Sequence, residues 1–378
     1  MSPSPTPATG LLTDKRVQRL SELPLACGAT LTDVAVGYET YGRLNADGDN
    51  AILVCHHFSG SSHAAGRYAT ADEAPGWWDA VIGPGKAIDT DRFFVVAMDA
   101  LGCVRRDSPH GVTTSAMSPN PATGRPYGPD FPPIAPADMV ESQRRVLDAL
   151  GVGRLVAVAG PSLGAVQAFA WADRYPRDVD RIIAAIGPTE LQAKEIGLYR
   201  VMEDAIRLDP AFQAGRYDPE SPPLNGLTVA LKLMMLLAGG REALMAAWGR
   251  SPADGEGIEW AMEAWLDREA RDRAGTIDAN AWISMLRANM RWDLRAGRDS
   301  LEAVVAGWPA RVLLLPAVAD ELIVPGAYHA PLESALRATG ADLRVQVLPA
   351  AHGHLAGLSD IAFAADAIRD CLESPLTR

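Results

Sequence analysis

The stretch that decides the fold is LVAVAGPSLGAVQAFAW, residues 155–171. Its first five residues are an unbroken apolar run, which is typical of a strand buried on both faces. The segment GPSLG follows at residues 160–164, and an apolar segment of helical character comes after it. Small residues on both sides of Ser162 let a strand and a helix approach closely while the serine hydroxyl points into a cleft. The stretch therefore predicts a strand, a tight turn that carries a candidate nucleophile, and a helix.

Similar apolar runs recur along the chain and define the rest of the expected core. They are AILVC at 51–55, FFVVA at 93–97, RIIAAI at 181–186, RVLLL at 311–315 and LRVQVL at 343–348. A helical pattern lies between two of these runs, at 138–150, and a last helix is expected at 360–372. Strands that alternate with helices predict a mostly parallel central sheet with helices on both faces, which is the α/β class.

A long segment without strand-like runs interrupts this alternation at residues 190–306, where the sequence is helical in character. We therefore expect a flexible N-terminal arm at 1–12, a core formed by 13–189 and 307–378, and an inserted helical lid at 190–306. The lid is rich in methionine and tryptophan. These side chains either line an adaptable apolar pocket or pack the lid helices against one another.

Composition excludes several classes of protein. The 378 residues carry a formal net charge of −12, and no cluster of Lys and Arg is present, so we expect no nucleic-acid partner. The four cysteines lie far apart without a CxxC pair, which favours reduced, mostly buried thiols over a zinc site. The first ten residues, MSPSPTPATG, lack the features of a secretory signal, and no stretch reaches the roughly 20 apolar residues of a membrane helix. We expect a cytoplasmic protein that does not associate with membranes.

A serine nucleophile needs a base and an acid, and after a turn of this kind they follow in chain order, the acid first. Asp320 lies just after the run at 311–315, with Glu321 as the alternative acid, and His352 and His354 lie just after the run at 343–348. The carboxyl ends of parallel strands meet at one edge of a sheet, so both loops should lie beside Ser162. Because no HExxH motif or further clustered ligand accompanies the two histidines, we expect no metal.

Two backbone amides are expected to bind the negative charge that develops on a substrate carbonyl oxygen. The amide of Leu163 lies at the N-terminus of the predicted helix, where the helix dipole favours an anion. The second donor should come from the loop after the run at 51–55, and we assign it to the amide of Phe58. The side chains of His56 and His57 in that loop are interpreted as structural.

Longer motifs resemble the homoserine O-acetyltransferase family of α/β-hydrolases. They are GYETYGRLNA (37–46), CHHFSGSSH (55–63), PGWWDAVIGPGKAIDTDRFF (75–94), NPATGRPYGPDFPPIAPADMV (120–140) and the Ser162 turn itself. The long segment at 75–94 is much more specific than the GxSxG pattern. The resemblance implies an α/β-hydrolase fold, a helical lid that mediates homodimer formation, and an acyl donor that is often acetyl-CoA.

The resemblance also implies roles for single residues. Ser162 would be the acylated nucleophile, Asp320 and His354 would complete a catalytic triad, and the amides of Phe58 and Leu163 would form the oxyanion hole. His354 is preferred to His352 because its Gly-His-Leu setting matches the family. An acyl-serine intermediate implies ping-pong chemistry.

The chain departs from the family pattern where the acceptor should bind. Members that bind homoserine follow the catalytic histidine with aspartate, where this chain has Leu355, and they carry an arginine in a lid helix, where this chain has Glu203. A shifted alignment would place Arg200 or Arg207 at the second position. A buried amino acid needs partners for both its carboxylate and its ammonium group, and leaving them without partners costs several kcal/mol, roughly.

These departures favour hydrolysis of short-chain esters, with acetyl esters foremost and water as the final acceptor. The substrate pocket would then include Leu355 and Glu203. The alternative is a homoserine O-acetyltransferase or a related acetyl-CoA-dependent O-acetyltransferase, and both alternatives use the same catalytic residues. A third hypothesis, a catalytically inactive binding protein on this fold, conflicts with the complete set of Ser162, Asp320 and His354. No cofactor is expected, because acetyl-CoA would act as an acyl donor.

Overall fold

The core of the molecule is a single eight-stranded sheet with the strand order β1-β2-β6-β3-β7-β8-β9-β10. The computed structural model describes residues 11–72, 74–253, 259–308, 311–349 and 351–376. The strands are β1 (Arg16–Pro24), β2 (Thr30–Tyr41), β3 (Ala51–Cys55), β6 (Phe94–Met98), β7 (Leu155–Pro161), β8 (Arg181–Ala185), β9 (Arg311–Leu315) and β10 (Leu343–Val345). From β6 to β10 all neighbours pair in parallel, whereas β1 and β2 are antiparallel. The predicted mostly parallel α/β sheet is confirmed.

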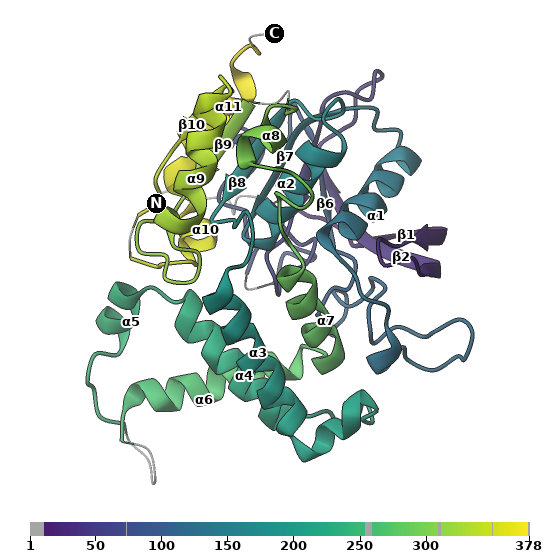
Figure 1. Cartoon of the computed structure of the whole chain (residues 1–378), viewed down its shortest axis with the longest axis vertical. Coiled ribbons are helices and arrows are strands. Elements are labelled where there is room, and N and C mark those ends of the chain that lie inside the picture. The colour runs from purple at the N-terminus through teal and green to yellow at the C-terminus, as the bar shows by residue number, and fades with distance from the viewer. Residues whose placement is uncertain (1–10, 73, 254–258, 309–310, 350, 377–378) are drawn as a thin grey trace, which may run out of the picture.

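Both faces of the sheet are buried. Successive side chains of a strand point to opposite sides, so one strand contributes to an apolar cluster on each face. In β3, Leu53 and Cys55 belong to the apolar cluster on one face, and Ile52 and Val54 belong to the cluster on the other. Helices α1 (Pro136–Ala149), α2 (Leu163–Arg174) and α9 (Pro325–Ala338) contribute to the first cluster, and α11 (Ala365–Glu373) contributes to the second. Figure 1 shows α1, α2, α9 and α11 around the strands of the sheet.

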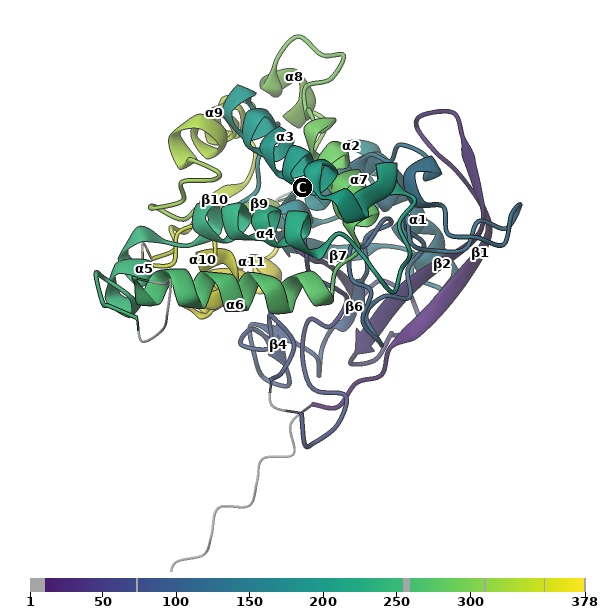
Figure 2. The ribbon, with the colours of Figure 1, turned by 90° about the horizontal axis from the view of Figure 1, so that it is seen from below.

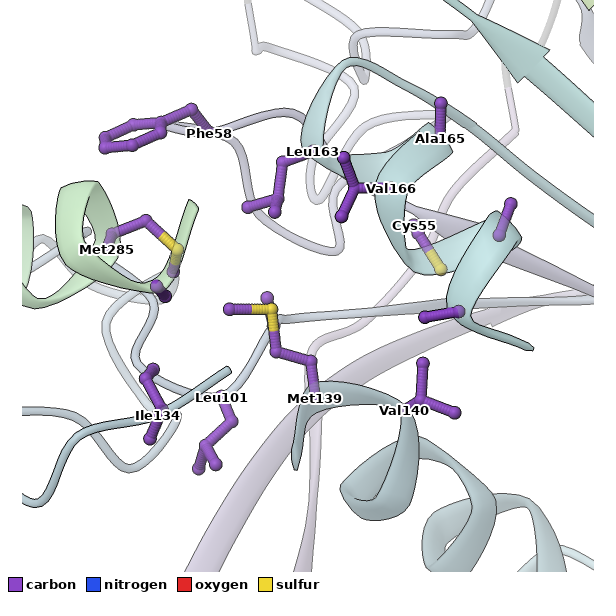
Figure 3. Packing of buried hydrophobic residues seen from close by; sticks show 14 of the residues in the cluster. Cys55, Phe58, Leu101, Ile134, Met139, Val140, Leu163, Ala165, Val166 and Met285 are labelled. Atoms are coloured by element: carbon purple, nitrogen blue, oxygen red, sulfur yellow. The ribbon is translucent and has the colours of Figure 1, made fainter. Parts of the chain in front are cut away.

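The first cluster also connects the core to the lid. Figure 3 shows Met139 and Val140 of α1, Leu163 and Val166 of α2, and Met285 of a lid helix gathered around the same interior. Small shifts of the helix that carries the Ser162 turn would therefore be resisted by packing from two sides.

The lid is the chain between β8 and β9. Its helices are α3 (Ala193–Leu208), α4 (Leu224–Ala238), α5 (Arg241–Ala247), α6 (Ala261–Gly275) and α7 (Ala279–Met290), with a short 3-10 helix at Pro210–Gly215. The two ends of this segment meet where Glu190 pairs with Asp293, and α8 (Leu301–Val305) then packs against α9. Figure 2 shows α3, α4 and α6 side by side across the end of the sheet.

Three details differ from the sequence expectations. The segment expected as one helix at 360–372 forms a 3-10 turn (Ile361–Ala364) followed by α11, and the short helix α10 (Ala356–Ser359) precedes it. The antiparallel pair β1 and β2, and the short pair β4 (Ile82–Gly83) and β5 (Ile88–Asp89), were not anticipated. The predicted flexible arm at 1–12 falls outside the described residues except for its last two, and Leu12 pairs with Arg67.

Other expectations concern the cysteines and the membrane. All four cysteines are free thiols, and three of them are buried, as predicted. Within the described ranges, no helix combines the length and apolarity needed to span a bilayer.

Candidate active site

Ser162 occupies a strained turn between β7 and α2. Its backbone angles are φ 55° and ψ −116°, a region that residues other than glycine rarely adopt. The two flanking glycines make the turn possible, because a Cβ atom on Gly160 or Gly164 would lie 2.4 or 2.1 Å from the carbonyl oxygen of Cys55. The end of β3 therefore packs directly against the turn, and no larger residue fits there.

The structure brings the three predicted catalytic residues into one hydrogen-bonded row. His354 Nε2 lies 2.9 Å from Ser162 Oγ, and His354 Nδ1 lies 2.7 Å from Asp320 Oδ2. The other oxygen of Asp320 accepts hydrogen bonds from the amides of Leu322 (3.0 Å) and Ile323 (2.7 Å). Asp320 and His354 are both buried. This is the geometry of a serine nucleophile, a histidine base and an acid that fixes the orientation of the base.

The two alternatives left open by the sequence lie elsewhere. Glu321 is exposed, and its backbone oxygen accepts a hydrogen bond from Lys194 Nζ at 3.3 Å. The His352 side chain is 43% exposed and bonds through Nδ1 to both carboxylate oxygens of Asp360, each at 2.9 Å. Neither residue is part of the row formed by Ser162, His354 and Asp320.

The two predicted oxyanion donors lie on the segments that flank Ser162. Leu163 is the first residue of α2, so its amide has no acceptor within the helix. Phe58 lines the same cavity as Ser162. Figure 3 shows the Phe58 and Leu163 side chains on neighbouring segments.

His56 fixes the peptide unit that contains the Phe58 amide. Its Nε2 accepts a hydrogen bond from the Ala100 amide at 2.8 Å, so the ring proton lies on Nδ1 and is donated to the His57 carbonyl at 2.6 Å. Because a peptide bond is planar, holding the His57 carbonyl also sets the direction of the Phe58 N–H. The His56 side chain was predicted to be structural, and its position directly after the run at 51–55 was the only signal in the sequence for this contact.

A buried group of His56, Asp99 and Cys103 has the composition of a metal site, with possible ligand atoms within 4.8 Å of one another. Both nitrogens of His56 are already used. Asp99 Oδ1 accepts from Lys15 (2.8 Å) and from the Ser62 amide (2.6 Å), and burial raises the pKa of Cys103 to about 12. Metal ligation needs a thiolate and a free imidazole nitrogen. These residues therefore fit a hydrogen-bond network that anchors the 56–62 loop better than they fit a metal.

A cavity of about 1090 Å³ opens above Ser162 and His354. Its walls come mainly from apolar side chains of the lid, including Leu231, Met234, Met235, Leu244, Trp248, Trp265 and Trp282. Leu355 also lines it and is 38% exposed, whereas Glu203 is not among the lining residues. Two of the lid methionines and three of its tryptophans thus form part of the wall of a pocket.

The assignment of Glu203 to the substrate pocket was wrong. Its side chain is 1% exposed and forms ion pairs with Arg207 of its own helix and with Arg287 of α7, each at 2.6 Å. An unpaired carboxylate would be costly to bury there, and the two guanidinium groups offset that cost. Glu203 therefore joins α3 to α7.

The fold and this site define the class of the protein. The family model described as the alpha/beta hydrolase fold matches residues 50–333. A homoserine O-acetyltransferase of Symbiobacterium thermophilum is 39% identical over 384 residues, which cover 99% of this chain and 98% of the relative. A homoserine O-succinyltransferase of Alkalilimnicola ehrlichii is 40% identical and covers 84% of this chain and 83% of its own length. The chain belongs to the homoserine O-acyltransferase family of α/β-hydrolases and is an acyl-transferring enzyme.

Solved structures of two kinds of enzyme resemble this chain. The homoserine O-acetyltransferase from Bacillus anthracis superposes with a TM-score of 0.92 at 33% identity, covering 97% of this chain and 99% of that one. Esterase E22 superposes with a TM-score of 0.89 at 37% identity, covering 96% of this chain and 100% of that one. A leucine-to-aspartate variant of the same esterase gives a TM-score of 0.90.

Replacing His56 by alanine should lower kcat by about 10- to 100-fold while KM changes less than about threefold, because the oxyanion donor is aimed less accurately. Steady-state kinetics with a chromogenic ester would measure both constants, and a thermal melt would show whether the variant is folded. A folded His56→Ala variant with kcat within twofold of the parent would contradict this role.

Stability should fall as the pH drops below about 6.5. Burial, followed by the neighbouring His56 and His354, lowers the pKa of His57 to about 3. Between that value and the unfolded value near 6.5, the unfolded chain binds a proton that the folded chain does not, so acidification favours unfolding. At pH 5 this effect amounts to about 2 kcal/mol for His57. The free energy of unfolding, measured by urea titration, should therefore change less between pH 7.5 and pH 5 in His57→Gln than in the parent protein. An equal change in both proteins would show that His57 does not cause this loss of stability.

Proposed function

We propose that the protein hydrolyses short-chain carboxylic esters, acetyl esters foremost, through an acyl group carried on Ser162. The observation that carries this proposal is the apolar side chain of Leu355, which follows His354 in the chain and lines the cavity above Ser162. Water needs no anchoring charge at that place, whereas an amino-acid acceptor needs two.

The proposed mechanism follows from the hydrogen-bonded row. His354 Nε2 takes the proton of Ser162 as Oγ attacks the ester carbonyl, and Asp320 stabilises the imidazolium that results. The amides of Phe58 and Leu163 donate to the tetrahedral oxyanion. His354 then gives its proton to the departing alcohol. A water molecule, deprotonated by the same nitrogen, releases the acid and restores Ser162.

The charged residues of the described pocket lining do not provide a clear site for homoserine. Arg105 pairs with Asp107, and Arg273 pairs with Glu269. Asp272 is exposed. Glu203, which stands at the position of the family's arginine, has its own two arginine partners outside the lining. The pocket thus suits an uncharged alcohol better than a zwitterion.

The second candidate is a homoserine O-acyltransferase, and the curated relatives favour it more than they favour hydrolysis. Relatives at 35–40% identity are named homoserine O-acetyltransferase or O-succinyltransferase. In that case acetyl-CoA or a similar thioester would be a substrate that gives up its acyl group. A high overall identity indicates a shared scaffold, and ester hydrolysis and acyl transfer would use the same scaffold and the same catalytic residues. The acceptor pocket distinguishes them, and esterase E22 is an example of hydrolysis on a closely similar scaffold.

The direct test is acetyl release from p-nitrophenyl acetate with and without homoserine, beside an assay of coenzyme A release from acetyl-CoA. We expect hydrolysis that is indifferent to homoserine and no release of coenzyme A. Homoserine-dependent release of coenzyme A would establish the transferase instead. In Leu355→Asp, a carboxylate beside His354 should lower ester hydrolysis by about tenfold, and Leu355→Met serves as the apolar control.

A further inference from the structure

The lid contacts the loop of His354 through backbone atoms. Where α4 ends and α5 begins, Gly239 pairs with Gly353 in an antiparallel bridge. The Leu355 amide donates to the Ala238 carbonyl at 3.2 Å. In the first turn of α5, the Ala243 amide donates to the Ala351 carbonyl at 3.1 Å. The α4–α5 junction is thus bonded to the chain on both sides of His354.

Two glycines allow this approach, and they do so for different reasons. Gly240 has φ −69°, which any residue adopts, yet a Cβ atom there would lie 2.1 Å from the Ala351 oxygen and 2.5 Å from the Gly353 nitrogen. Gly353 has φ +58°, and its Cβ atom would lie 2.8 Å from Gly240 Cα. The 2.5 Å distance to the Gly353 nitrogen and the 2.8 Å distance to Gly240 Cα are both shorter than the contacts that real Cβ atoms make. The two backbones therefore touch only because neither residue has a side chain.

The same contact reaches the other members of the catalytic row. A Cβ atom on Gly353 would also lie 3.3 Å from the carbonyl oxygen of Ala319, the residue before Asp320. The lid junction, the Asp320 loop and the His354 loop therefore meet at Gly353. The next residue, His354, must hold hydrogen bonds of 2.9 Å to Ser162 and 2.7 Å to Asp320.

We propose that Gly240 and Gly353 are positioning residues through which the lid holds the imidazole of His354 in register with Ser162. The proposal rests on the role of His354 as the base of Ser162, and it applies equally to hydrolysis and to acyl transfer. The lid then has two functions, since it forms the pocket wall and also places the base. Displacement of the α4–α5 junction would be transmitted to His354 through the bonded backbone.

The test is Gly240→Ala, with Gly197→Ala as the matched control. A methyl group on Gly240 must push the 351–355 loop away by about 1 Å, and misplacement of that size costs on the order of 100-fold in rate. A methyl group on Gly197, in lid helix α3, meets nothing within 4 Å. We expect kcat for p-nitrophenyl acetate and the rate of Ser162 labelling by a fluorophosphonate to fall about 100-fold in Gly240→Ala, with KM within about threefold. Gly197→Ala should stay within twofold of the parent.

A double variant separates positioning from a general effect on the fold. In a His354→Ala background the base is absent, so adding Gly240→Ala should change the residual rate less than about twofold. A further loss comparable to that in the parent background would overturn the proposal, because the glycine would then act through something other than His354.

A gentler variant covers the case in which Gly240→Ala does not fold. Ala243→Pro removes the amide that donates to Ala351, and proline is tolerated in the first turn of a helix. We expect the labelling rate to fall about tenfold, because one hydrogen bond between α5 and the His354 loop is lost. Normal labelling in folded Gly240→Ala or Ala243→Pro refutes the positioning role alone. Failure of the parent protein to label at Ser162 would overturn the proposed function, and this inference with it.

Discussion

The contact between the carbonyl oxygen of Cys55 and the glycines on either side of Ser162 is the constraint on which the rest of the site depends. It holds the end of β3 against the turn between β7 and α2, so the loop that follows β3 lies beside the nucleophile. The loop is fixed in turn by His56 and Asp99, which bond to the backbone at its two ends. One close backbone contact therefore sets the distance between the nucleophile and its nearest amide donors.

Much of this arrangement was predictable from the sequence. Mostly apolar runs identified six of the eight strands, because strands buried on both faces have few polar positions. Chain order placed Asp320 and His354 in loops that the structure brings to Ser162, since successive parallel strands deliver their loops to one edge of the sheet. The pair β1 and β2 was missed because exposed residues interrupt the buried positions of both strands, so neither strand is an unbroken apolar run.

The predictions that were wrong or missing also have physical explanations. Glu203 was assigned to the pocket by counting along a helix, but sequence spacing does not reveal which face of α3 meets α7. Two arginines from different helices satisfy its charge, and only the folded structure brings Arg287 within 2.6 Å. Likewise, nothing in the letters GG at 239–240 indicates that the partner of Gly240 lies more than a hundred residues later. Contacts between backbones leave little trace in a single sequence.

The scaffold and the acceptor site carry separate information about function. The fold is common to the transferase and the esterase that resemble this chain, whereas Leu355 and the paired charges around the pocket concern only the acceptor. The central claim is that an acyl group passes through Ser162 in either case. Rapid quenching during turnover of an acetyl ester, followed by peptide mass mapping, tests it most directly. The account predicts an acetyl group on the peptide that contains Ser162 and neither adduct nor turnover in Ser162→Ala, whereas undiminished turnover in that variant would contradict it.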